Sequence, residues 1–350
     1  MRSRLWVASA HVERRGRHAG GGIQVSAGEA TAQPVCSPLA RSAIFLVFVV
    51  EPGGESSVRA LFEGLTGLVR SVGTRSPRAG LTCVVGIGSQ AWDRLFAGAR
   101  PAELHRFAGV VGERHSAVST PGDVLLHIRA EAMDLCFELA ALVTSRLAGA
   151  ASVVDEVHGF QYFDDRDLLG FVDGTENPSG AAAYAAATVG DEDPTFAGGS
   201  YVLVQKYVHD LAAWEALSVE EQERVVGRTK LSNVELGDDV KPSNSHVALN
   251  VLEDGDGRQL QILRANMPFG NVGRSEHGTY YIAYSRTPSI VERMLENMFL
   301  GDPPGNYDRI LDFSTALTGS SYFAPTVEFL DELPPPAAGV VDRVPPGAPA

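Results

Sequence analysis

Apolar residues in the first half of the chain follow two patterns, continuous runs and a helical spacing. The run at residues 43–50 is apolar and rich in β-branched residues, which predicts a strand buried on both faces. Apolar residues at i, i+3, i+4 and i+7 predict amphipathic helices. The patterns predict, in order, strand 43–50, helix 58–72, strands 81–88 and 123–129, helix 135–147 and strand 151–160. This β-α-β-β-α-β order is typical of a ferredoxin-like unit, an antiparallel sheet with helices on one face.

The second half of the chain repeats this order. Ser218 and Glu221 form a capping-box pattern, S-x-x-E, at the start of a helix. The remaining patterns predict strand 200–208, strands 259–267 and 278–286, helix 289–300 and strand 321–329. The similarity between the halves lies in their topology, since no residue-level repeat is visible. The sequence therefore predicts an α+β fold of duplicated ferredoxin-like units, with antiparallel sheets and helices.

The ends of the chain differ in composition from its middle. The first residues are basic and glycine-rich, and the last 17 residues contain six prolines and almost nothing to bury, which indicates a flexible tail. We expect a disordered N-terminal extension over 1–40, a first domain over 41–160, a second domain with a cofactor cleft over 161–330, and a Pro/Ala-rich flexible tail over 331–350. The N-terminal apolar stretch is too short for a signal peptide.

Charge and cysteine content narrow the class of function. The 350 residues carry a formal net charge of −14, which argues against nucleic acid or an anionic membrane as a partner. No apolar run reaches the roughly 18–20 residues of a membrane span. The three cysteines are far apart and form no CxxC pattern, which makes structural zinc, a disulfide framework or covalent haem attachment improbable. We expect a cytoplasmic protein.

The segment GFVDGTENPSG at residues 170–180 places Asp173 between an apolar pair and a glycine. One interpretation is structural, because Asp-Gly is a common turn pair. The other is chemical, because a carboxylate shielded from water by Phe171 and Val172 can move protons as a general acid or base. The glycines at 170 and 174 allow the backbone to approach a flat ligand closely. The pattern alone does not decide between these two.

Three further polar residues lie in apolar surroundings downstream. His246 stands in PSNSHVALN, and Arg264 and Asn266 stand in ILRANMPFG. A lone histidine is commonly a surface or core residue, but a charged arginine at the end of an apolar strand is unusual. An imidazole, a buried arginine and a shielded carboxylate are what a peroxidase needs. The imidazole ligates haem iron, the carboxylate moves a proton between the peroxide oxygens, and the arginine stabilises the developing negative charge.

The segments GFVDGTENP, NSHV and ILRANMPFG resemble those of the dye-decolorizing peroxidases, a haem-b family with a G-x-x-D-G motif, and most closely its B-type bacterial branch. The resemblance runs from about Ala43 to Pro325. It implies that Asp173 is the distal proton shuttle, Arg264 the distal charge stabiliser and Asn266 a distal-pocket residue. His246 is then the proximal iron ligand.

The resemblance also implies a set of residues around the haem, placed in the second unit. Asp308 corresponds to the carboxylate that accepts a hydrogen bond from the iron-ligating imidazole. Gly174, Thr175 and Glu176 are expected to bind the cofactor, together with His246 and Arg264. In the family, the acid that matches Glu176 is discussed as part of a manganese site. A second acid of that site falls near Gln259 here, which argues against efficient Mn(II) oxidation.

The function implied by the resemblance is a haem-b peroxidase that reduces hydrogen peroxide through an oxoferryl intermediate. It oxidises phenolic or dye-type one-electron donors. The alternatives are a haem carrier or iron-release protein of the deferrochelatase kind, or a scaffold or shell cargo with incidental haem. The resemblance further implies a cytoplasmic homo-oligomer. It implies loading into an encapsulin shell only for a form with a longer C-terminus, since no docking peptide precedes Ala350.

Overall fold

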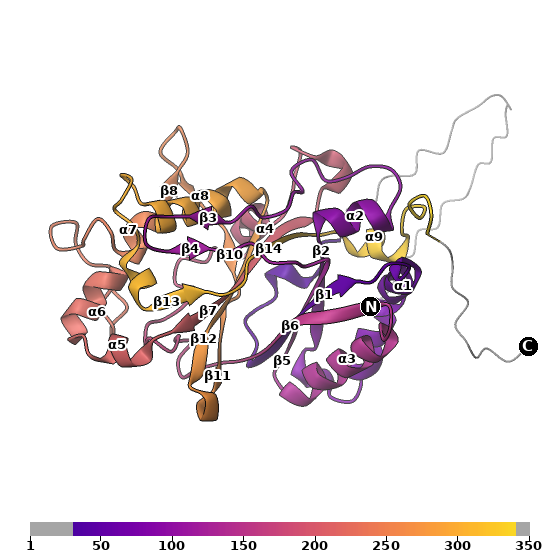
Figure 1. The fold of residues 1–350 in the computed structure, drawn as a ribbon, viewed down its shortest axis with the longest axis horizontal. Coiled ribbons are helices and arrows are strands. Elements are labelled where there is room, and N and C mark those ends of the chain that lie inside the picture. The colour runs from indigo at the N-terminus through magenta and orange to yellow at the C-terminus, as the bar shows by residue number, and fades with distance from the viewer. Residues whose placement is uncertain (1–30, 341–350) are drawn as a thin grey trace, which may run out of the picture.

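The computed structural model describes residues 31–340, which form two units that share one sheet (Figure 1). The first unit contains β1 (Ser42–Val50), α1 (Glu55–Gly73), β2 (Thr82–Ile87), α2 (Ser89–Leu95), β5 (Val124–Ala130), α3 (Met133–Arg146) and β6 (Ala151–Phe160). Short elements accompany them: η1 (Pro34–Cys36), η2 (Pro77–Ala79), β3 (Val110–Val111) and β4 (Ser116–Ala117). The predicted strand 151–160 is confirmed at both ends.

The second unit carries the remaining elements. Its main strands and helices are β7 (Ser200–His209), α5 (Leu211–Glu215), α6 (Val219–Val226), α7 (His246–Asn250), β11 (Met267–Asn271), β12 (Glu276–Ser285), α8 (Pro288–Leu300) and β14 (Ser320–Ala324). The smaller ones are α4 (Ala181–Ala187), η3 (Pro194–Phe196), β8 (Leu252–Glu253), β9 (Gln259–Leu260), β10 (Leu263–Arg264), η4 (Val272–Arg274), η5 (Arg309–Asp312), β13 (Ser314–Ala316) and α9 (Val327–Asp331). Ser218 caps α6, because its side chain accepts a hydrogen bond from the Glu221 backbone N–H at 3.3 Å.

Strand order confirms the predicted duplication. The first unit has the order β6-β1-β5-β2, and the second has the equivalent order β14-β7-β12-β11. Every pairing is antiparallel. The pairs Phe269–Gly159 and Phe323–Ile87 join the two sheets at both edges, so that these strands close into a barrel. If the two units were separate, each sheet would have exposed edge strands, and closure of the barrel removes these edges.

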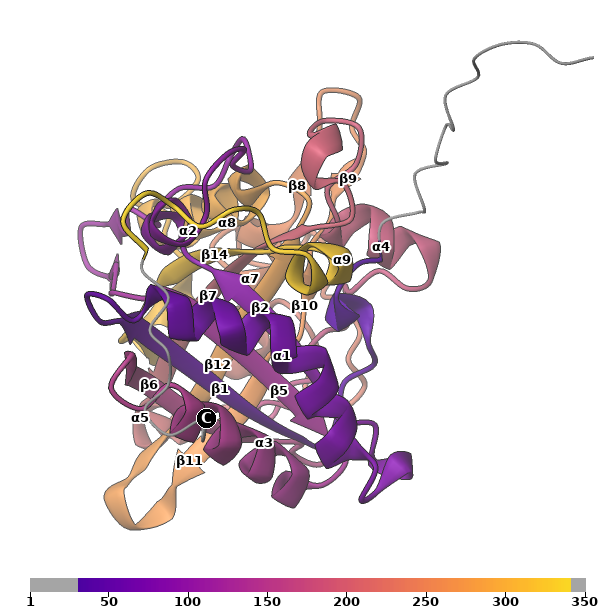
Figure 2. The same cartoon turned by 90° about the vertical axis from the view of Figure 1, so that its right-hand side faces the viewer.

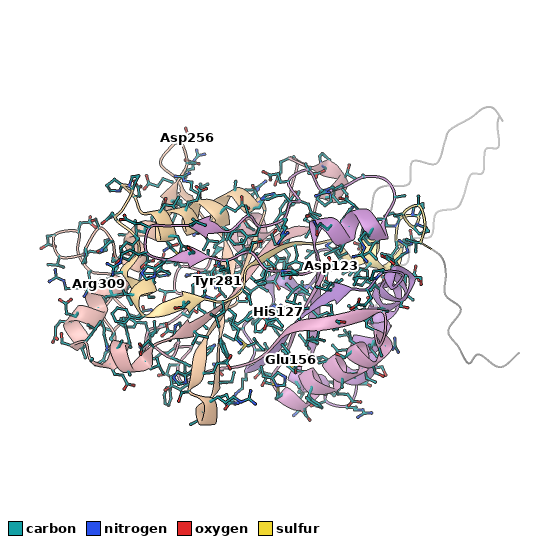
Figure 3. The ribbon with its side chains drawn as sticks, in the orientation of Figure 1. Asp123, His127, Glu156, Asp256, Tyr281 and Arg309 are labelled. Carbon is teal, nitrogen blue, oxygen red and sulfur yellow. The ribbon has the colours of Figure 1, made fainter. Side chains whose placement is uncertain are left out.

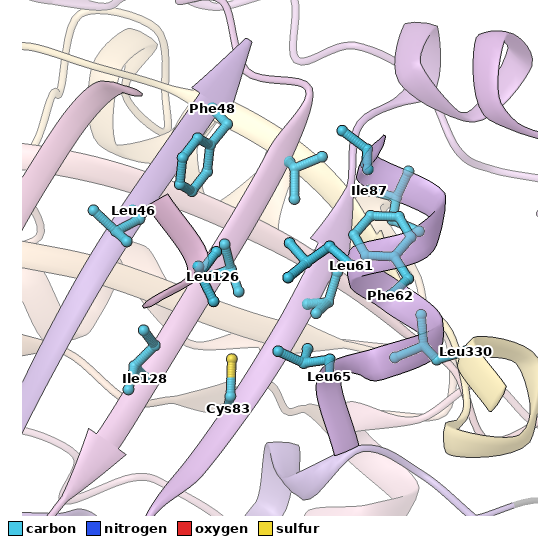
Figure 4. Packing of buried hydrophobic residues seen from close by; sticks show 14 of the residues in the cluster. Leu46, Phe48, Leu61, Phe62, Leu65, Cys83, Ile87, Leu126, Ile128 and Leu330 are labelled. Carbon is cyan, nitrogen blue, oxygen red and sulfur yellow. The ribbon is translucent and has the colours of Figure 1, made fainter. Parts of the chain in front are cut away.

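Each face of the sheet buries its own apolar core. The outer face of the first unit packs against α1 and α3, which lie across it (Figure 2). Leu46, Phe48 and Leu126 from the strands meet Leu61 and Phe62 from α1 (Figure 4). The opposite face fills the barrel with side chains from both units, and a separate cluster packs α8 on the second sheet. Among the described helices, none is both long enough and apolar enough to cross a bilayer.

Two predicted strands were wrong in extent. The predicted strand 259–267 is divided into β9, β10 and the start of β11. The Asn177 side chain hydrogen-bonds the backbone N–H and C=O of Arg264, and the Asn266 side chain accepts from the Ile282 N–H. These side chains therefore form hydrogen bonds that a neighbouring strand would form in a continuous sheet. The predicted strand 321–329 ends at Ala324, because Pro325 has no N–H to donate and Thr326 then caps α9.

The predicted disorder of residues 1–40 needs correction in its last part, and residues 1–30 lie outside the described residues. Gln33 and Val35 are buried. The Gln33 side chain donates to the carbonyls of Val85 and Pro325 and accepts from the Val85 N–H, at 2.8–2.9 Å. These contacts connect Val85 and Pro325, which lie two residues beyond the Phe323–Ile87 pair at the junction of β2 and β14. Gln33 therefore closes the barrel where the two strands separate.

The predicted flexible tail over 331–350 needs a similar correction, and residues 341–350 lie outside the described residues. Arg59 donates to the Pro334 carbonyl at 2.8 Å, and the Ala97 N–H donates to the Pro335 carbonyl at 2.8 Å. Pro336 also forms an isolated bridge with Phe96. The first part of the tail is therefore held against α1 and α2, because its carbonyls satisfy donors there.

We expect Gln33→Ala to lower the free energy of unfolding by about 3 kcal/mol or more, because it leaves buried groups of Val85 and Pro325 without partners. Urea unfolding followed by circular dichroism measures this loss. Gln90→Ala, at an exposed position of α2, is the control and should change stability by less than about 0.5 kcal/mol. Equal stability of the two variants would show that Gln33 does not hold the barrel closed.

Candidate active site

A cleft in the second unit lies between the outer face of its sheet and the helices α7 and α8. Its empty volume, including the part open to solvent, is about 1420 Å³. The sheet side carries Tyr207, His209, Arg264, Asn266, Thr279 and Tyr281, the last labelled on β12 in Figure 3. The helix side carries His246, Met294, Leu295 and Met298. The loop before α4 supplies Asp167, Leu169, Phe171, Asp173, Gly174, Thr175 and Glu176. The cleft thus combines an apolar helical wall with a polar loop and sheet.

His246 is the first residue of α7, whose N-cap is Ser245. Its Nδ1 lies 2.7 Å from Oδ2 of Asp308, which is fully buried. The other oxygen, Oδ1, accepts from the Ile310 N–H at 3.0 Å. This geometry fits a neutral imidazole that donates Nδ1–H to the carboxylate and keeps its lone pair on Nε2. Nε2 makes no hydrogen bond to any described residue, so it is available to a ligand in the cleft.

The carboxylate of Asp173 accepts three hydrogen bonds. Nδ2 of Asn266 donates to both carboxylate oxygens, at 3.3 and 3.0 Å, and the Gly174 N–H donates to Oδ1 at 2.7 Å. The Asp173 N–H donates to the carbonyl of Asp165. Gly170 and Gly174 have φ of 92° and 74°, which side chains rarely tolerate. The Asp-Gly pair therefore lies in a turn that fixes the carboxylate at the cleft, and its role in proton transfer stays a prediction.

Arg264 borders the same cleft and is half-buried. The side chain of Asn177 holds its backbone, donating to its carbonyl at 2.7 Å and accepting from its N–H at 2.9 Å. The guanidinium forms no hydrogen bond or ion pair with any residue between 31 and 340. A partly buried cation without a counter-charge is costly. The unpaired guanidinium is able to stabilise a ligand in the cleft that is anionic or becomes negatively charged.

The structure brings the predicted residues together. Asp173, Arg264 and Asn266 lie on one side of the cleft and His246 on the other, with Asp308 behind it. Gly174, Thr175, Glu176 and Gln259 also border the cleft. Glu176 pairs with Arg228 at 2.8 Å, and Thr175 accepts from Asn233. These contacts fix the loop beside the cleft opening.

Among the polar residues that line the cleft, the sequence prediction gave no role to Arg228, Asp167 and His209. Arg228 and Asp167 lie in polar segments that carry no recognisable spacing. Burial raises the pKa of Asp167 to about 7, with a smaller contribution from the charge of Asp173. Burial lowers the pKa of His209 to about 4, and its ring nitrogens contact the hydroxyls of Ser314 and Thr279. His209 is therefore neutral near pH 7 and shows no free nitrogen for a metal.

The side chains that could bind a metal in the cleft fit an iron cofactor better than a free metal ion. Within residues 31–340, no group of three or more His, Cys, Asp or Glu side chains could hold an ion. A single imidazole backed by a buried carboxylate suits an iron that brings its own planar ligands, as haem does. The apolar wall of Met294, Leu295 and Met298 would suit the ring, and the unpaired guanidinium of Arg264 would stabilise negative charge on a ligand beside it. The residues present fit a haem.

We expect Asp308→Asn to move the imidazole proton of His246. Because Oδ1 accepts from the Ile310 N–H, the new amide NH₂ takes the place of Oδ2 and donates to Nδ1. The proton then resides on Nε2, which weakens iron binding by about tenfold to a hundredfold. Imidazole ¹⁵N NMR of the haem-free protein and titration with haem measure the two effects.

Asn250→Ala is the matched control, because Asn250 contacts the same pair through its amide but leaves the carboxylate in place. It should keep the Nδ1–H tautomer. An unchanged tautomer in Asp308→Asn would contradict the role given to Asp308.

Comparison with known proteins gives the family. Residues 32–161 match the model of the Dyp-type peroxidase N-terminal domain, and residues 164–329 match that of the C-terminal domain. A dye-decolorizing peroxidase of Rhodococcus erythropolis is 64% identical over 302 residues, covering 86% of this chain and 89% of that protein.

Solved structures agree in fold and sequence. The encapsulated DyP-type peroxidase from Mycobacterium smegmatis is 61% identical, with a TM-score of 0.86 over 87% of this chain and 99% of that chain. A DypB variant from Rhodococcus jostii in complex with heme is 55% identical, with a TM-score of 0.85 over 86% and 98%. Deferrochelatases of Yersinia pestis are only 26% identical over 199 residues. The chain belongs to the Dyp-type peroxidase family.

Proposed function

We propose that this chain is a haem-b peroxidase that reduces hydrogen peroxide and oxidises small aromatic one-electron donors. One observation carries the proposal: the His246–Asp308 pair borders the same cleft as the Asp173–Asn266 pair and the unpaired guanidinium of Arg264. The relative in complex with heme supports haem as the cofactor. When bound, haem supplies the iron at which the O–O bond of peroxide is broken.

The proximal residues hold the cofactor. His246 offers Nε2 as the iron ligand, and Asp308 keeps that nitrogen free of a proton by accepting Nδ1–H. The negative charge on Asp308 also increases electron donation from the imidazole. Gly174, Thr175 and Glu176 lie along the loop that borders the cleft, where they would contact the cofactor. The buried position of Asp308 keeps water away from this hydrogen bond.

The distal residues act on peroxide. Asp173 accepts the proton from one peroxide oxygen and delivers it to the other. Asn266 orients both carboxylate oxygens for this transfer. Arg264 stabilises the negative charge that develops on the leaving oxygen. One hydrogen peroxide takes up two electrons and two protons and yields two molecules of water, and two one-electron donors supply the electrons.

Phenols and dye-type aromatics are the donors that we propose, and Mn(II) is a poor one. Gln259 supplies a neutral amide at the edge of the cleft, where an acid would be needed for a cation. Glu176 is already paired with Arg228, which also lies 3.6 Å from the Glu235 carboxylate. Carboxylates engaged in this way offer little negative charge to a second metal.

We also propose a cytoplasmic homo-oligomer. Encapsulation is described for the relative from Mycobacterium smegmatis. By similarity to that protein, we propose that a form of this chain that carries a docking peptide is loaded into an encapsulin shell. Size-exclusion chromatography with light scattering gives the oligomeric state directly.

We expect Asp173→Ala and Arg264→Leu to bind haem as the natural protein does and to react with hydrogen peroxide about 10²–10³-fold more slowly. The reason is that each removes a group that acts on peroxide and leaves His246 in place. Stopped-flow absorbance of the haem-loaded variants gives the second-order rate. Arg274→Leu removes an exposed arginine and should keep the natural rate. Full rates in both site variants would contradict the proposed roles.

The haem-carrier alternative rests on the weak likeness to deferrochelatases. It requires His246 and the cleft but not Asp173 or Arg264. Mixing the haem-loaded protein with an excess of apomyoglobin separates the two functions. Retention of haem over many peroxide turnovers supports the peroxidase, whereas rapid transfer without turnover supports the carrier.

A further inference from the structure

Asp167 is a second carboxyl group of the cleft, on the same loop as Asp173. Its N–H donates to the Phe171 carbonyl at 2.8 Å, and its Oδ1 accepts from the Phe171 N–H at 2.9 Å. Its carbonyl accepts from the Gly170 N–H at 3.1 Å. These bonds close the loop on itself immediately before Asp173.

The closed loop is anchored by apolar packing. Phe171 is buried against Trp214, with ring centroids 6.1 Å apart and nearly perpendicular. The Trp214 indole N–H donates to the Leu169 carbonyl at 2.9 Å. Asp173 follows Phe171 by two residues. The side chain of Asp167 therefore fixes the backbone from which Asp173 projects.

Charged groups surround Asp167, but none of the described ones pairs with its carboxyl. On its own loop, Arg166 donates to the carbonyls of Gly170 and Lys230. On the segment after α6, Lys230 bonds Gln222 through Nζ and Glu223 through its backbone N–H.

Asp173 and His209 are among the other titratable groups that border the same cleft. Asp173 adds a negative charge from the same loop, and His209 lies on the sheet. His209 is uncharged near neutral pH, because burial lowers its pKa to about 4. Asp167 thus forms no ion pair with a described residue, although the charge of Lys230 lies near enough to interact with it, and its neighbour on the loop, Asp173, is a second carboxylate.

We propose that Asp167 is a positioning residue for Asp173 and that its proton acts as a pH switch on the peroxide reaction. With the proton bound, Asp167 adds no negative charge beside Asp173. Without it, a second negative charge faces the cleft and opposes the charge that develops on the leaving peroxide oxygen beside Arg264. The reaction then slows. This proposal rests on the proposed function for its kinetic part only.

The titration has a direction that can be measured without peroxide. Burial raises the pKa of Asp167 to about 7, above its ordinary value of 3.8. Between these two values the folded chain holds a proton that the unfolded chain has lost. The contribution of Asp167 to the free energy of unfolding therefore falls as pH rises from about 4 to about 7. Above about pH 7 this contribution does not fall further.

The first test uses Asp167→Asn in the full haem-loaded chain. Asparagine keeps an oxygen for the Phe171 N–H but cannot ionise. Thermal unfolding from pH 5 to pH 8, without peroxide, should show a higher melting temperature for Asp167→Asn than for the natural protein at pH 8. The two curves should converge toward pH 5. Asp164→Asn removes an exposed charge from the same loop and should follow the natural protein.

The second test is the pH profile of the reaction with hydrogen peroxide. The natural protein should lose roughly fivefold or more in rate as pH rises through 7, the size that repulsion between nearby charges gives. Asp167→Asn should lack this decline, and Asp164→Asn should keep it. A decline that persists in Asp167→Asn, with unchanged pH dependence of melting, would overturn the proposal.

A third measurement uses only the natural protein, so it does not depend on correct folding of the variant. In the natural protein labelled with ¹³C-aspartate, one carboxyl should titrate near pH 7, and its absence would also overturn the proposal. If the natural protein does not react with peroxide, the proposed function fails. The melting and carboxyl titrations still decide whether Asp167 is the group that titrates.

Discussion

The register between β7 and β12 is the constraint on which the site depends. The two strands pair without interruption from Val208–Gly278 to Tyr201–Ser285. Because side chains alternate across a strand, Tyr280, Ile282 and Tyr284 fill the barrel, whereas Thr279 and Tyr281 face the cleft. A slip of one residue would turn the side chains of the first set toward the cleft and those of the second set into the barrel. Both the packing of the core and the lining of the cleft would be lost. Gly278 secures this register, because a Cβ there would lie 1.7 Å from the Tyr207 carbonyl oxygen.

Side-chain amides connect the cleft loop to this sheet. Asn177, from the loop, binds the backbone of Arg264 on β10, and Asn266 accepts from the Ile282 N–H on β12 while it donates to Asp173. The carboxylate and the arginine are thereby placed by the same strands that form the core. Such preorganisation is what stabilisation of charge in a reaction requires, because the groups need not move when the charge appears.

The sequence was informative where local pattern decides structure. Apolar runs such as that of β1 and helical spacings such as that of α1 predicted the order of elements in both units, because strand and helix periods differ. The division of residues 259–267 could not be predicted, since amides from Asn177 and Asn266 replace the ladder partners. The burial of Gln33 was missed for a similar reason, because its partners Val85 and Pro325 are distant in sequence.

The residues of the site also differ in whether the sequence could predict them. Resemblance to a family, rather than spacing, paired His246 with Asp308, which are 62 positions apart. Asp167 and Arg228 had no pattern to mark them, because their roles arise only from the cleft that they border. The central claim is that haem bound through His246 reacts with peroxide under the control of Asp173 and Arg264. The most direct measurement is the absorbance spectrum of the haem-loaded protein within milliseconds of mixing with one equivalent of hydrogen peroxide. We expect a rapid change of the Soret band that a phenol then reverses, whereas a bound haem with an unchanged spectrum would contradict the claim.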